Sequence, residues 1–346
     1  MTLISHYLDN IDLDKNKVDI IHVDKYGINE EIENVTMYKY PIKINAKWSK
    51  LRKAKEYYKF KPYAKKIISQ NNYDLIIVWG TYTGHLFKDF LVKKYSNRYI
   101  LNIRDYFYEN NKMIYYRMKK MVENSLITTI SSDGFLEFLP KSNKYQVIYS
   151  FNKQIIDRSK KNVEFSTKTP LKISFIGNNR FYDIHKKFML KLKNDERFLI
   201  QYFGTGSKIL EEFAKENNIN NTKFIDGFQM NLTPKLLDET DILNNIYGNK
   251  EIALKTALSI RLYYSIYLNK PILTSPNTYT SYVSNRLGLG FDIDVDSNID
   301  FGDSIINWYK SLEINKINEL TTNEVINIED NNEIFYSEIK RIINNV

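Results

Sequence analysis

Short apolar segments that alternate with helical ones restrict the fold of this chain more than any other feature. The first half contains Tyr73–Gly80, Tyr99–Ile103 and Leu126–Ser131, and a helical pattern follows each of them. The alternation begins again with Leu171–Ile176 and Phe198–Phe203. Strands that alternate with helices form parallel sheets through crossover connections. We therefore predict an α/β protein with two Rossmann-like, doubly wound parallel-sheet domains.

The domain boundaries follow from the position of a stretch without periodicity. Residues 153–170 are polar and charged, which indicates a linker. We predict a first domain over residues 1–152, a second over 171–329 and a separate C-terminal helix over 330–346. At 346 residues the chain is long enough for two domains.

The composition excludes several kinds of chemistry. The chain has no cysteine, which rules out disulfides, thiolate catalysis and cysteine-ligated zinc. Its four histidines lack the spacing of metal ligands, so we expect no metal site (His6, His22, His85 and His185). No apolar run reaches the roughly 18 residues of a membrane span, and the N-terminus lacks a signal-peptide pattern. We expect a cytoplasmic protein.

A net charge of +9 favours anionic partners. Nucleic acid, an anionic membrane surface and a phosphorylated small molecule all remain open. The charge is concentrated in Trp48–Lys66, where aromatic residues lie between the lysines. One interpretation is peripheral membrane contact, with Trp48, Tyr57, Tyr58 and Phe60 entering the interface. The other is a solvated helix face. Nucleic-acid binding is less favoured, because no recognised reading module accompanies the charge.

The segment Ala257–Thr274 predicts a helix that leads directly into a buried strand. Leu258, Leu262 and Ile266 recur every four residues and so share one helix face. Pro271 cannot continue the helix. Arg261 lies near the helix start, where an anion would also meet the helix N-terminus. A packed helix with one exposed arginine is the competing interpretation.

Glycine-containing loops follow the predicted strands of the second half, at the edge where parallel sheets bind ligands. The loops begin at Gly177, Gly204, Asp226 and Asn244. Glycine lets backbone amides approach a ligand closely, and Arg180 and Arg261 would supply bidentate donors to phosphate oxygens. The spacing does not match the dinucleotide fingerprint, since Gly204-Thr205-Gly206 lacks a third glycine.

The order of these motifs resembles the donor half of GT-B glycosyltransferases. The motifs are strand-Gly-x-x-Arg, "YFGTGS", "FIDGF", "DILNNIYG" and "ALSIRLYYSIYLNKPILTS", over about residues 171 to 295. The chain is most similar to bacterial family-4-like enzymes of capsule and exopolysaccharide assembly. The first half resembles their acceptor half less specifically, through "NNYDLIIVWGTYTG", "YILNIRDYF" and "TTISSDGFLEFLP".

The resemblance implies a nucleotide-sugar donor as substrate, with no cofactor, held by the second half. The donor residues that it implies are Gly177, Arg180, Lys186, Gly204, Gly206, Gly227, Phe228, Tyr247, Arg261 and Tyr264. Arg180 stands at a diphosphate contact of the family, Arg261 at the basic position of its "NKLYE"-like segment, and Phe228 near the base. It also implies a cleft between the halves and a C-terminal helix that crosses back to the first.

The sequence departs from the family pattern at three places. Tyr264 stands where the family carries an acid that holds ribose hydroxyls. His185, Lys186 and Lys187 compete for the place of the family's lysine after the first donor loop. The family opens with a strand and a glycine loop, whereas this chain reaches its first strand only at Val18.

Candidate catalytic and acceptor residues lie in the first half. His85 follows the predicted loop Gly80–Gly84 and would act as a general base on an acceptor hydroxyl. A partly exposed histidine near a helix start, without a catalytic role, is the competing interpretation. Arg104 and Asp105 lie at the end of a strand. Asp105 would activate or orient the acceptor; a local ion pair or a helix cap is the competing interpretation. Thr81, Tyr82 and Arg104 are the acceptor-binding candidates.

The repeat Asp292-Ile293-Asp294-Val295-Asp296 contains the Asp-x-Asp pattern of metal-dependent GT-A enzymes. No metal-ligand partners accompany it in the sequence, and a solvated acidic loop is the favoured interpretation.

Together these observations predict a metal-independent glycosyltransferase that acts on a saccharide or lipid-linked saccharide in surface polysaccharide synthesis. The alternative is a catalytically weak or inactive partner subunit of a polysaccharide assembly complex. A basic nucleic-acid-binding protein is the third hypothesis.

Overall fold

The computed structural model describes residues 4–25, 27, 31–43, 45 and 48–345. They form two units. Unit 1 contains the described residues up to 130, residues 138–148 and those from 332 onward, and unit 2 contains residues 131–137 and 149–331. The sequence also indicates a helix or helix and turn over Met1–Lys15 and a second strand over Met37–Ile44, of which Met1–Leu3 and Ile44 lie outside the described residues.

Unit 1 is built on a four-stranded parallel sheet in the order β3-β4-β5-β6. Its strands are Ile76–Trp79 (β3), Tyr99–Ile103 (β4), Ile127–Ile130 (β5) and Tyr145–Val147 (β6). A separate parallel pair joins Val18–Asp24 (β1) to Val35–Pro41 (β2). The helices are Ser5–Leu8 (α1), Lys50–Tyr58 (α2), Phe60–Asn71 (α3), Thr81–Lys94 (α4) and Lys112–Asn124 (α5).

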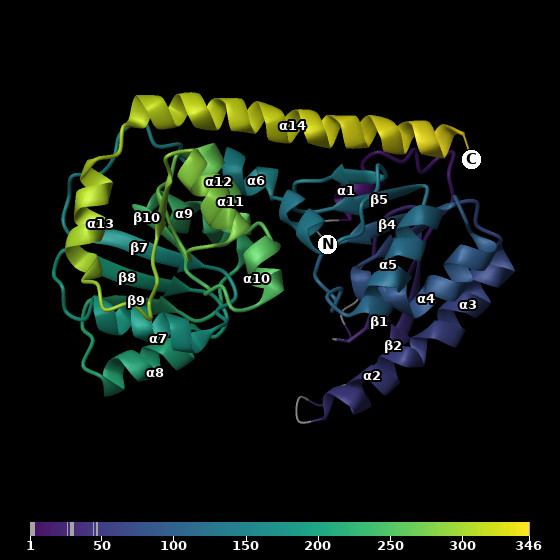
Figure 1. The fold of residues 1–346 in the computed structure, drawn as a ribbon, viewed down its shortest axis with the longest axis horizontal. Coiled ribbons are helices and arrows are strands. Elements are labelled where there is room, and N and C mark those ends of the chain that lie inside the picture. The colour runs from purple at the N-terminus through teal and green to yellow at the C-terminus, as the bar shows by residue number, and fades with distance from the viewer. Residues whose placement is uncertain (1–3, 26, 28–30, 44, 46–47, 346) are drawn as a thin grey trace. The chain divides into compact units, whose positions relative to one another are not determined.

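Unit 2 has a six-stranded parallel sheet in the order β12-β11-β10-β7-β8-β9. Its strands are Leu171–Ile176 (β7), Phe198–Phe203 (β8), Thr222–Ile225 (β9), Ile242–Asn245 (β10), Ile272–Thr274 (β11) and Gly290–Asp292 (β12). Its helices are Asp133–Glu137 (η1), Lys153–Asp157 (α6), Tyr182–Lys191 (α7), Ser207–Glu216 (α8), Met230–Leu232 (η2), Thr233–Asp238 (α9), Ile252–Thr256 (α10), Ile260–Leu268 (α11), Tyr279–Arg286 (α12) and Phe301–Lys310 (α13). Figure 1 shows α11 and α12 on one side of this sheet and α7 and α8 on the other, which is the doubly wound arrangement.

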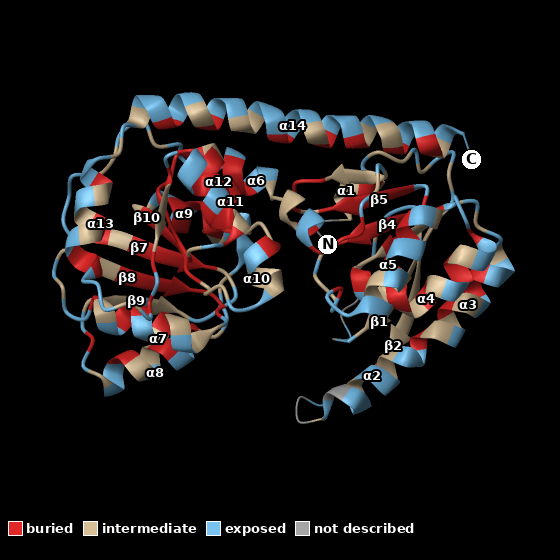
Figure 2. Cartoon of the chain, viewed as in Figure 1, coloured by how far each residue is buried: buried red, intermediate tan, exposed pale blue. Residues whose placement is uncertain are grey.

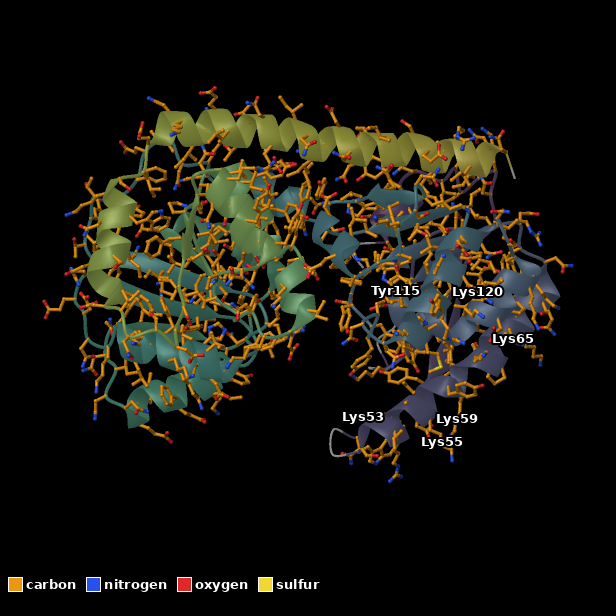
Figure 3. The ribbon with its side chains drawn as sticks, viewed as in Figure 1. Lys53, Lys55, Lys59, Lys65, Tyr115 and Lys120 are labelled. Atoms are coloured by element: carbon orange, nitrogen blue, oxygen red, sulfur yellow. The ribbon has the colours of Figure 1, made fainter. Side chains whose placement is uncertain are left out.

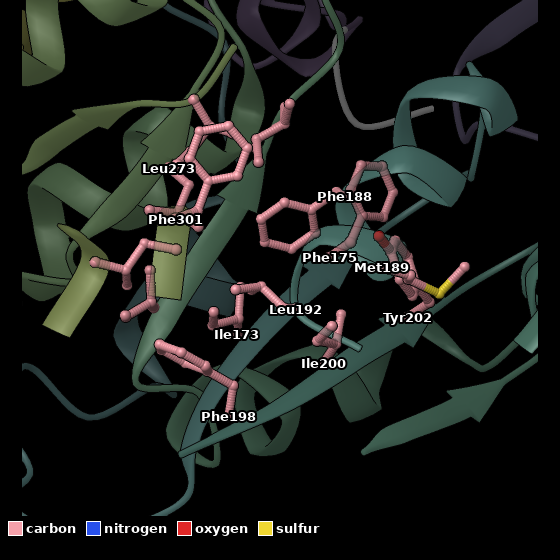
Figure 4. Packing of buried hydrophobic residues seen from close by; sticks show 14 of the residues in the cluster. Ile173, Phe175, Phe188, Met189, Leu192, Phe198, Ile200, Tyr202, Leu273 and Phe301 are labelled. Carbon is pink, nitrogen blue, oxygen red and sulfur yellow. The ribbon is translucent and has the colours of Figure 1, made fainter. Parts of the chain in front are cut away.

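The cores explain why these segments are strands. All five residues of β4 are buried, as expected for a central strand of a parallel sheet, and Figure 2 shows the strands of both sheets mostly in the colour of buried residues. In unit 2, Ile173, Phe175 and Ile200 of the sheet pack with Phe188 and Met189 of α7 (Figure 4). The prediction of an α/β fold with two parallel-sheet units is confirmed.

The first helix after β3 corrects the sequence analysis. The predicted loop Gly80–Gly84 is wrong, because α4 begins at Thr81. A Cβ atom on Gly84 would lie 2.9 Å from Leu101 Cδ1. Gly84 therefore permits close packing of α4 on β4. In the sequence, a glycine with this role cannot be told from one in a loop.

Other helices also differ from the prediction. Helix α6 occupies the start of the predicted linker, and α10 was not predicted. The final helix, α14 (Ile314–Asn344), is 31 residues long and begins well before the predicted boundary at residue 330. Its buried positions recur at spacings of three, four and seven residues (Ile317, Thr321, Ile328, Asn332, Phe335, Ile339 and Ile342). Two of these buried positions are polar, so the buried face of the helix cannot be recognised from apolar residues alone.

Candidate active site

The candidate site lies where β7 and β10 are neighbours in the sheet of unit 2. From β7 the chain proceeds to β8 and β9 on one side, whereas β11 and β12 lie on the other. At such a reversal of strand order the connections leave in opposite directions, and a crevice forms beyond the carboxyl ends of the strands. Residues after β7 and β10 therefore face the place where ligands bind in sheets of this topology.

The loops after β7 and β8 contact each other through glycines. Gly177 and Gly204 each have φ +133°, and a Cβ atom on Gly204 would lie 1.8 Å from the Gly177 carbonyl oxygen. Asn179 secures the contact, since its Nδ2 donates to the Gly204 carbonyl at 3.2 Å and to Ser207 Oγ at 2.9 Å. These two predicted site glycines therefore have a structural role, which is to bring the two loops together.

Gly206, at the start of α8, also lies in close contact. A Cβ atom there would lie 2.4 Å from the Tyr182 hydroxyl. Its backbone amide donates to Asp226 Oδ1 at 2.8 Å. The Gly206 amide, which was predicted to face a ligand, therefore already donates its hydrogen bond to a carboxylate of the protein.

Arg261 is the central cation of the site. Residue Ile260 opens α11, Ser259 Oγ caps the helix by accepting from the Arg261 amide at 3.3 Å, and the Arg261 side chain is buried. Its Nη1 donates to the Ile176 carbonyl at the end of β7 (2.7 Å) and its Nε to Asn245 Oδ1 at the end of β10 (3.1 Å). The guanidinium group thus spans the two strands that border the crevice.

Aromatic rings complete the surroundings of Arg261. Its guanidinium lies over the ring of Phe175 at 4.1 Å and that of Tyr247 at 5.0 Å, and its Nη2 donates to the Tyr247 hydroxyl. The interpretation of Arg261 as an exposed arginine on a packed helix is wrong, because only 3% of its surface is exposed.

Within the part of the chain that the structure describes, the guanidinium of Arg261 has no counter-ion. Among the described residues, no carboxylate oxygen lies within 4.0 Å of it, and burial lowers its pKa to about 9. A buried cation is unfavourable unless an anion accompanies it. The position is therefore suited to a phosphate group that enters the crevice.

Tyr247 links Arg261 to a cavity of about 180 Å³ within unit 2. The cavity is lined by the segment after β10, by Ser275 and Pro276 after β11, and by residues 293–296 after β12. The hydroxyl oxygen of Ser275 accepts from the amides of Tyr247 and Gly248 at 3.1 and 2.7 Å, which fixes the loop after β10.

Phe181 also lines this cavity and precedes α7. Its φ of +56° is unusual for a side chain of this size, and its ring contacts that of Tyr247 edge to face. Strained backbone of this kind clusters at functional sites. Phe181 was not predicted as a site residue, and no local motif indicates it. Asn245 lies in the "DILNNIYG" motif at the predicted ligand edge but was not singled out, since its contact with Arg261 forms across the sheet edge.

Tyr264 follows Arg261 by three residues on α11 and is buried. Burial raises its pKa to about 12, although the nearby Arg261 charge opposes this. The side chain is therefore neutral at physiological pH, and this position offers a hydroxyl group in place of a carboxylate.

The remaining cationic candidates of unit 2 differ in their surroundings. Arg180 is exposed in the loop after β7. The ammonium of Lys186 lies over the ring of Phe213 on α8, at 5.0 Å, and Lys187 forms an ion pair with Asp296. His185 is buried between Phe175 and Tyr202, with ring centroids 4.8 and 5.1 Å away. Of these side chains, Arg180 and Lys187 are exposed, but Lys187 is paired with Asp296.

Gly227 and Phe228, the predicted site residues in the loop after β9, differ in exposure. Gly227 is exposed with φ +76° and nothing within 4 Å of a Cβ atom, and Phe228 is half-buried. The turn therefore requires a glycine-like conformation without close packing around it.

In unit 1, the acceptor candidates gather at the carboxyl ends of β3 and β4. Thr81 Oγ1 donates to the Asp105 carbonyl oxygen at 2.7 Å, and Asp105 is exposed. Tyr82 packs edge to face on Phe107, and the guanidinium of Arg104 lies 5.9 Å from the Trp79 ring centre. The structure therefore brings Thr81 and Asp105 together at the sheet edge.

His85 differs from the expectation of a cleft-facing base. It lies in the second turn of α4, and both of its ring nitrogens are buried. Nε2 is 3.7 Å from the buried carboxylate of Glu109, and the ring contacts Phe107. An acceptor does not reach these nitrogens in this conformation, because Phe107 and Glu109 lie against the imidazole.

The acidic residues from Asp292 to Asp296 each have a local partner. Asp292 accepts from Thr274 Oγ1 and Ser281 Oγ, Asp294 accepts from the Asp296 amide, and Asp296 pairs with Lys187 and Lys250. Across the described residues there is no group of three or more histidine or acidic side chains that could hold a metal ion.

Two parallel-sheet units, the second with the strand order 3-2-1-4-5-6, are the GT-B fold of glycosyltransferases. The chain is similar to sucrose-phosphate synthase from Thermosynechococcus elongatus, with 8% identity, a TM-score of 0.67 and coverage of 95% of this chain and 88% of that one.

Two further solved structures share the fold. HepE from Anabaena in complex with UDP has 11% identity and a TM-score of 0.56 over 90% of this chain and 85% of that one. WaaG, a glycosyltransferase involved in lipopolysaccharide biosynthesis, has 10% identity and a TM-score of 0.52 over 99% and 90%. No protein-family model and no curated protein sequence matches the chain.

The burial of His185 predicts sensitivity to acid. Burial, with the Arg261 charge as a second cause, lowers the pKa of His185 from 6.5 to about 3. Between these values the unfolded chain binds a proton that the folded chain does not, so stability falls as pH falls from 6.5 toward 3, by about 1.4 kcal/mol per pH unit. His185→Phe keeps an aromatic ring and should remove this part of the slope in urea unfolding measured from pH 7 to pH 4. Equal slopes for both proteins would contradict the prediction.

Proposed function

We propose that the chain is a glycosyltransferase that moves a sugar from a nucleotide-diphosphate donor to a saccharide or lipid-linked saccharide, without a metal ion. The supporting observation is the buried guanidinium of Arg261 between β7 and β10, which has no carboxylate partner among the described residues. Residues 171–329 would hold the donor and residues 1–152 the acceptor. The similarity to a solved UDP complex adds support for a nucleotide donor.

The proposed chemistry depends on charge at the leaving group. As the bond to the sugar breaks, negative charge develops on the diphosphate, and a fixed cation there stabilises the transition state more than the ground state. Arg261 is held in place by the Ile176 carbonyl and Asn245, so little reorganisation is needed. Arg180 at the exposed edge would add a second donor to phosphate oxygens, and Tyr247 would orient the first.

In the acceptor half, Asp105 is the residue that we assign to the acceptor hydroxyl. It is exposed at the end of β4, beside Thr81. His85 would contribute only after Phe107 moves away from its ring, and we assign it no direct contact. Similarity to WaaG, which is involved in lipopolysaccharide biosynthesis, favours a role in surface polysaccharide synthesis.

A panel of nucleotide sugars tests this function. A donor that binds the folded chain raises its melting temperature, and UDP-, GDP-, CMP- and dTDP-sugars together cover the common bases. We expect one base to stabilise the chain, and we expect the same donor to be consumed when an acceptor extract is added, also in the presence of EDTA. No stabilisation by any member would contradict the proposal.

The second candidate is a catalytically weak partner subunit. Tyr264 in place of an acid and the enclosed imidazole of His85 favour it. It predicts binding of the same donor without consumption, and a further rise in melting temperature only when a partner chain is present. The donor-consumption assay separates the two candidates.

A basic helix of unit 1 supports a peripheral membrane contact. Figure 1 shows α2 extending outward from unit 1, and Figure 3 labels Lys53 and Lys55 on it and Lys59 directly after it, with Lys65 on α3 and Tyr115 and Lys120 on α5. Leu51 is 85% exposed on the same helix and Tyr58 58%. Exposed apolar side chains among lysines are typical of a helix that lies on an anionic bilayer.

The predicted contact of Phe60 with the interface is wrong, because Phe60 is buried against Tyr40 and Phe87. Within the described part of the chain, no helix has the length and apolar character that a membrane crossing requires. The proposed contact is therefore a peripheral one, made by α2 and the residues that flank it, without Phe60.

Replacement of three lysines on α2 and directly after it tests the contact. Lys53, Lys55 and Lys59 changed together to Glu should abolish co-sedimentation with vesicles that contain phosphatidylserine, because each lysine near an anionic surface contributes about 1 kcal/mol. A matched triple change in unit 2 (Lys193, Lys208 and Lys235 to Glu) should leave sedimentation nearly unchanged. Equal loss in both variants would indicate a general charge effect and would contradict the assignment to α2.

A further inference from the structure

A short segment between β5 and β6 belongs to a different unit from the strands that it connects. Both strands are part of unit 1, whereas residues 131–137, which contain η1, are part of unit 2. The segment contacts α10, the helix between the loop after β10 and α11. Tyr247 precedes α10 and Arg261 follows it. The segment therefore lies against the part of the chain that carries both residues of the proposed donor site.

Ser132 and Gly134 make this contact specific. Ser132 is wholly buried, and its hydroxyl donates to the Thr256 carbonyl at 2.6 Å while it accepts from the Gly134 amide at 3.1 Å. Thr256 is the last residue of α10, so its carbonyl has no partner within the helix. A Cβ atom on Gly134 would lie 2.3 Å from that same oxygen. Only glycine lets the segment approach so closely.

The backbone from Thr256 to Ser259 and the hydrogen bonds along it lead from this contact to Arg261. Thr280 Oγ1 donates to the Ala257 carbonyl at 3.1 Å and accepts from the Ser259 amide at 3.4 Å. Ser259 Oγ in turn caps α11 at the amide of Arg261. Residues 256–259 are thus held by Ser132 on one side and Thr280 on the other, and only Ile260 separates them from Arg261.

We propose that Ser132 and Gly134 are positioning residues of the donor site: they fix the end of α10 and thereby the placement of Arg261 between β7 and β10. This inference rests on the proposed function and adds to it. Since residues 131–137 connect two strands of unit 1, they also provide a covalent route by which a change in the acceptor half reaches the arginine. Neither residue contacts a ligand in this assignment.

The competing explanation is that Ser132 simply stabilises the fold. Ser125 provides a matched control, because it is also wholly buried and its hydroxyl donates to the last turn of a helix, at the Val122 carbonyl (2.8 Å). It lies in unit 1, and its bonds lead to Val122 and Thr128. Ser132→Ala and Ser125→Ala thus each remove one buried hydrogen bond to a helix end.

The experiment compares the binding of UDP and UMP, or of the corresponding nucleotides of whichever base binds, to the wild type and both variants. Loss of one hydrogen bond that positions the guanidinium should weaken diphosphate binding by about five- to tenfold in Ser132→Ala. Monophosphate binding should change less, because fewer phosphate oxygens meet Arg261. Ser125→Ala should bind both nucleotides like the wild type. Gly134→Ala should reproduce the Ser132→Ala pattern with a larger loss.

A second measurement does not depend on any ligand. Amide hydrogen exchange of residues 257–262 should become faster in Ser132→Ala than in Ser125→Ala. Unchanged diphosphate affinity in Ser132→Ala, or equal exchange in both variants, would overturn the inference. If the wild type binds no nucleotide, the proposed function fails, while faster exchange would still support the positioning of residues 257–262.

Discussion

Arg261→Met should reduce the affinity for the nucleotide diphosphate by about 100-fold, which corresponds to roughly 2.7 kcal/mol. Methionine retains much of the apolar volume over Phe175 but removes the charge and the donors to the Ile176 carbonyl and Asn245. Charge-assisted hydrogen bonds to phosphate contribute most where water is excluded, as around this buried side chain. Titration calorimetry of the variant against the wild type measures the loss.

The apparent loss must be separated from a general loss of folding. Arg197 is a suitable control, because it lies in the same unit but pairs with Asp195 and Asp303 near the surface. Arg197→Met should leave the affinity within about twofold. The melting temperature of both variants is measured alongside, because Arg261→Met also leaves the Ile176 carbonyl and Asn245 Oδ1 without their donor. Wild-type affinity in Arg261→Met would remove the donor-site assignment.

Gly204→Ala should prevent stable folding of unit 2, with a loss of more than about 4 kcal/mol. The new Cβ atom would lie 1.8 Å from the Gly177 carbonyl oxygen, and the backbone at φ +133° is unfavourable for any side chain. Backbone atoms lie on both sides of the contact, so a rotamer change does not relieve it. Urea unfolding, or the yield of soluble protein, measures the effect.

Gly227→Ala isolates the backbone part of this cost. Gly227 has φ +76° but nothing within 4 Å of a Cβ atom. Its replacement should cost only about 1 kcal/mol. If Gly204→Ala were no worse than Gly227→Ala, the close contact between the loops after β7 and β8 would not exist in solution.

The sheet strands could be predicted from the sequence because each is a short apolar run with a clear end. The bounds of β4, β7 and β8 agree with the prediction to the residue. Burial on both faces of a parallel sheet produces such runs directly. The two-unit α/β architecture therefore follows from composition and alternation alone.

The helices were harder to predict where packing overrides local pattern. Gly84 suggested a loop, yet it lies within α4 because it packs against Leu101. In the first half of α14, Thr321 occupies a buried position whereas Ile326 is exposed, so the apolar residues do not mark the buried face. In both places the deciding contact comes from a residue far away in the sequence.

The same limit applies to the candidate site. The position of Arg261 near a helix start was predicted, whereas its burial and its bonds to Ile176 and Asn245 depend on how β7 and β10 pair. His85 was predicted at an exposed edge, and the earlier start of α4 turns it inward against Glu109. A one-turn error in a helix start is enough to change which residues face a ligand.

The most direct test of the central claim is a calorimetric titration of the wild-type chain with UDP, GDP, ADP and dTDP and with the corresponding monophosphates. A guanidinium that lacks a counter-ion at the reversal of strand order predicts saturable binding of one nucleoside diphosphate, at least tenfold tighter than its monophosphate. Absence of saturable binding for every nucleotide, or equal affinities for the diphosphate and the monophosphate, would contradict the account.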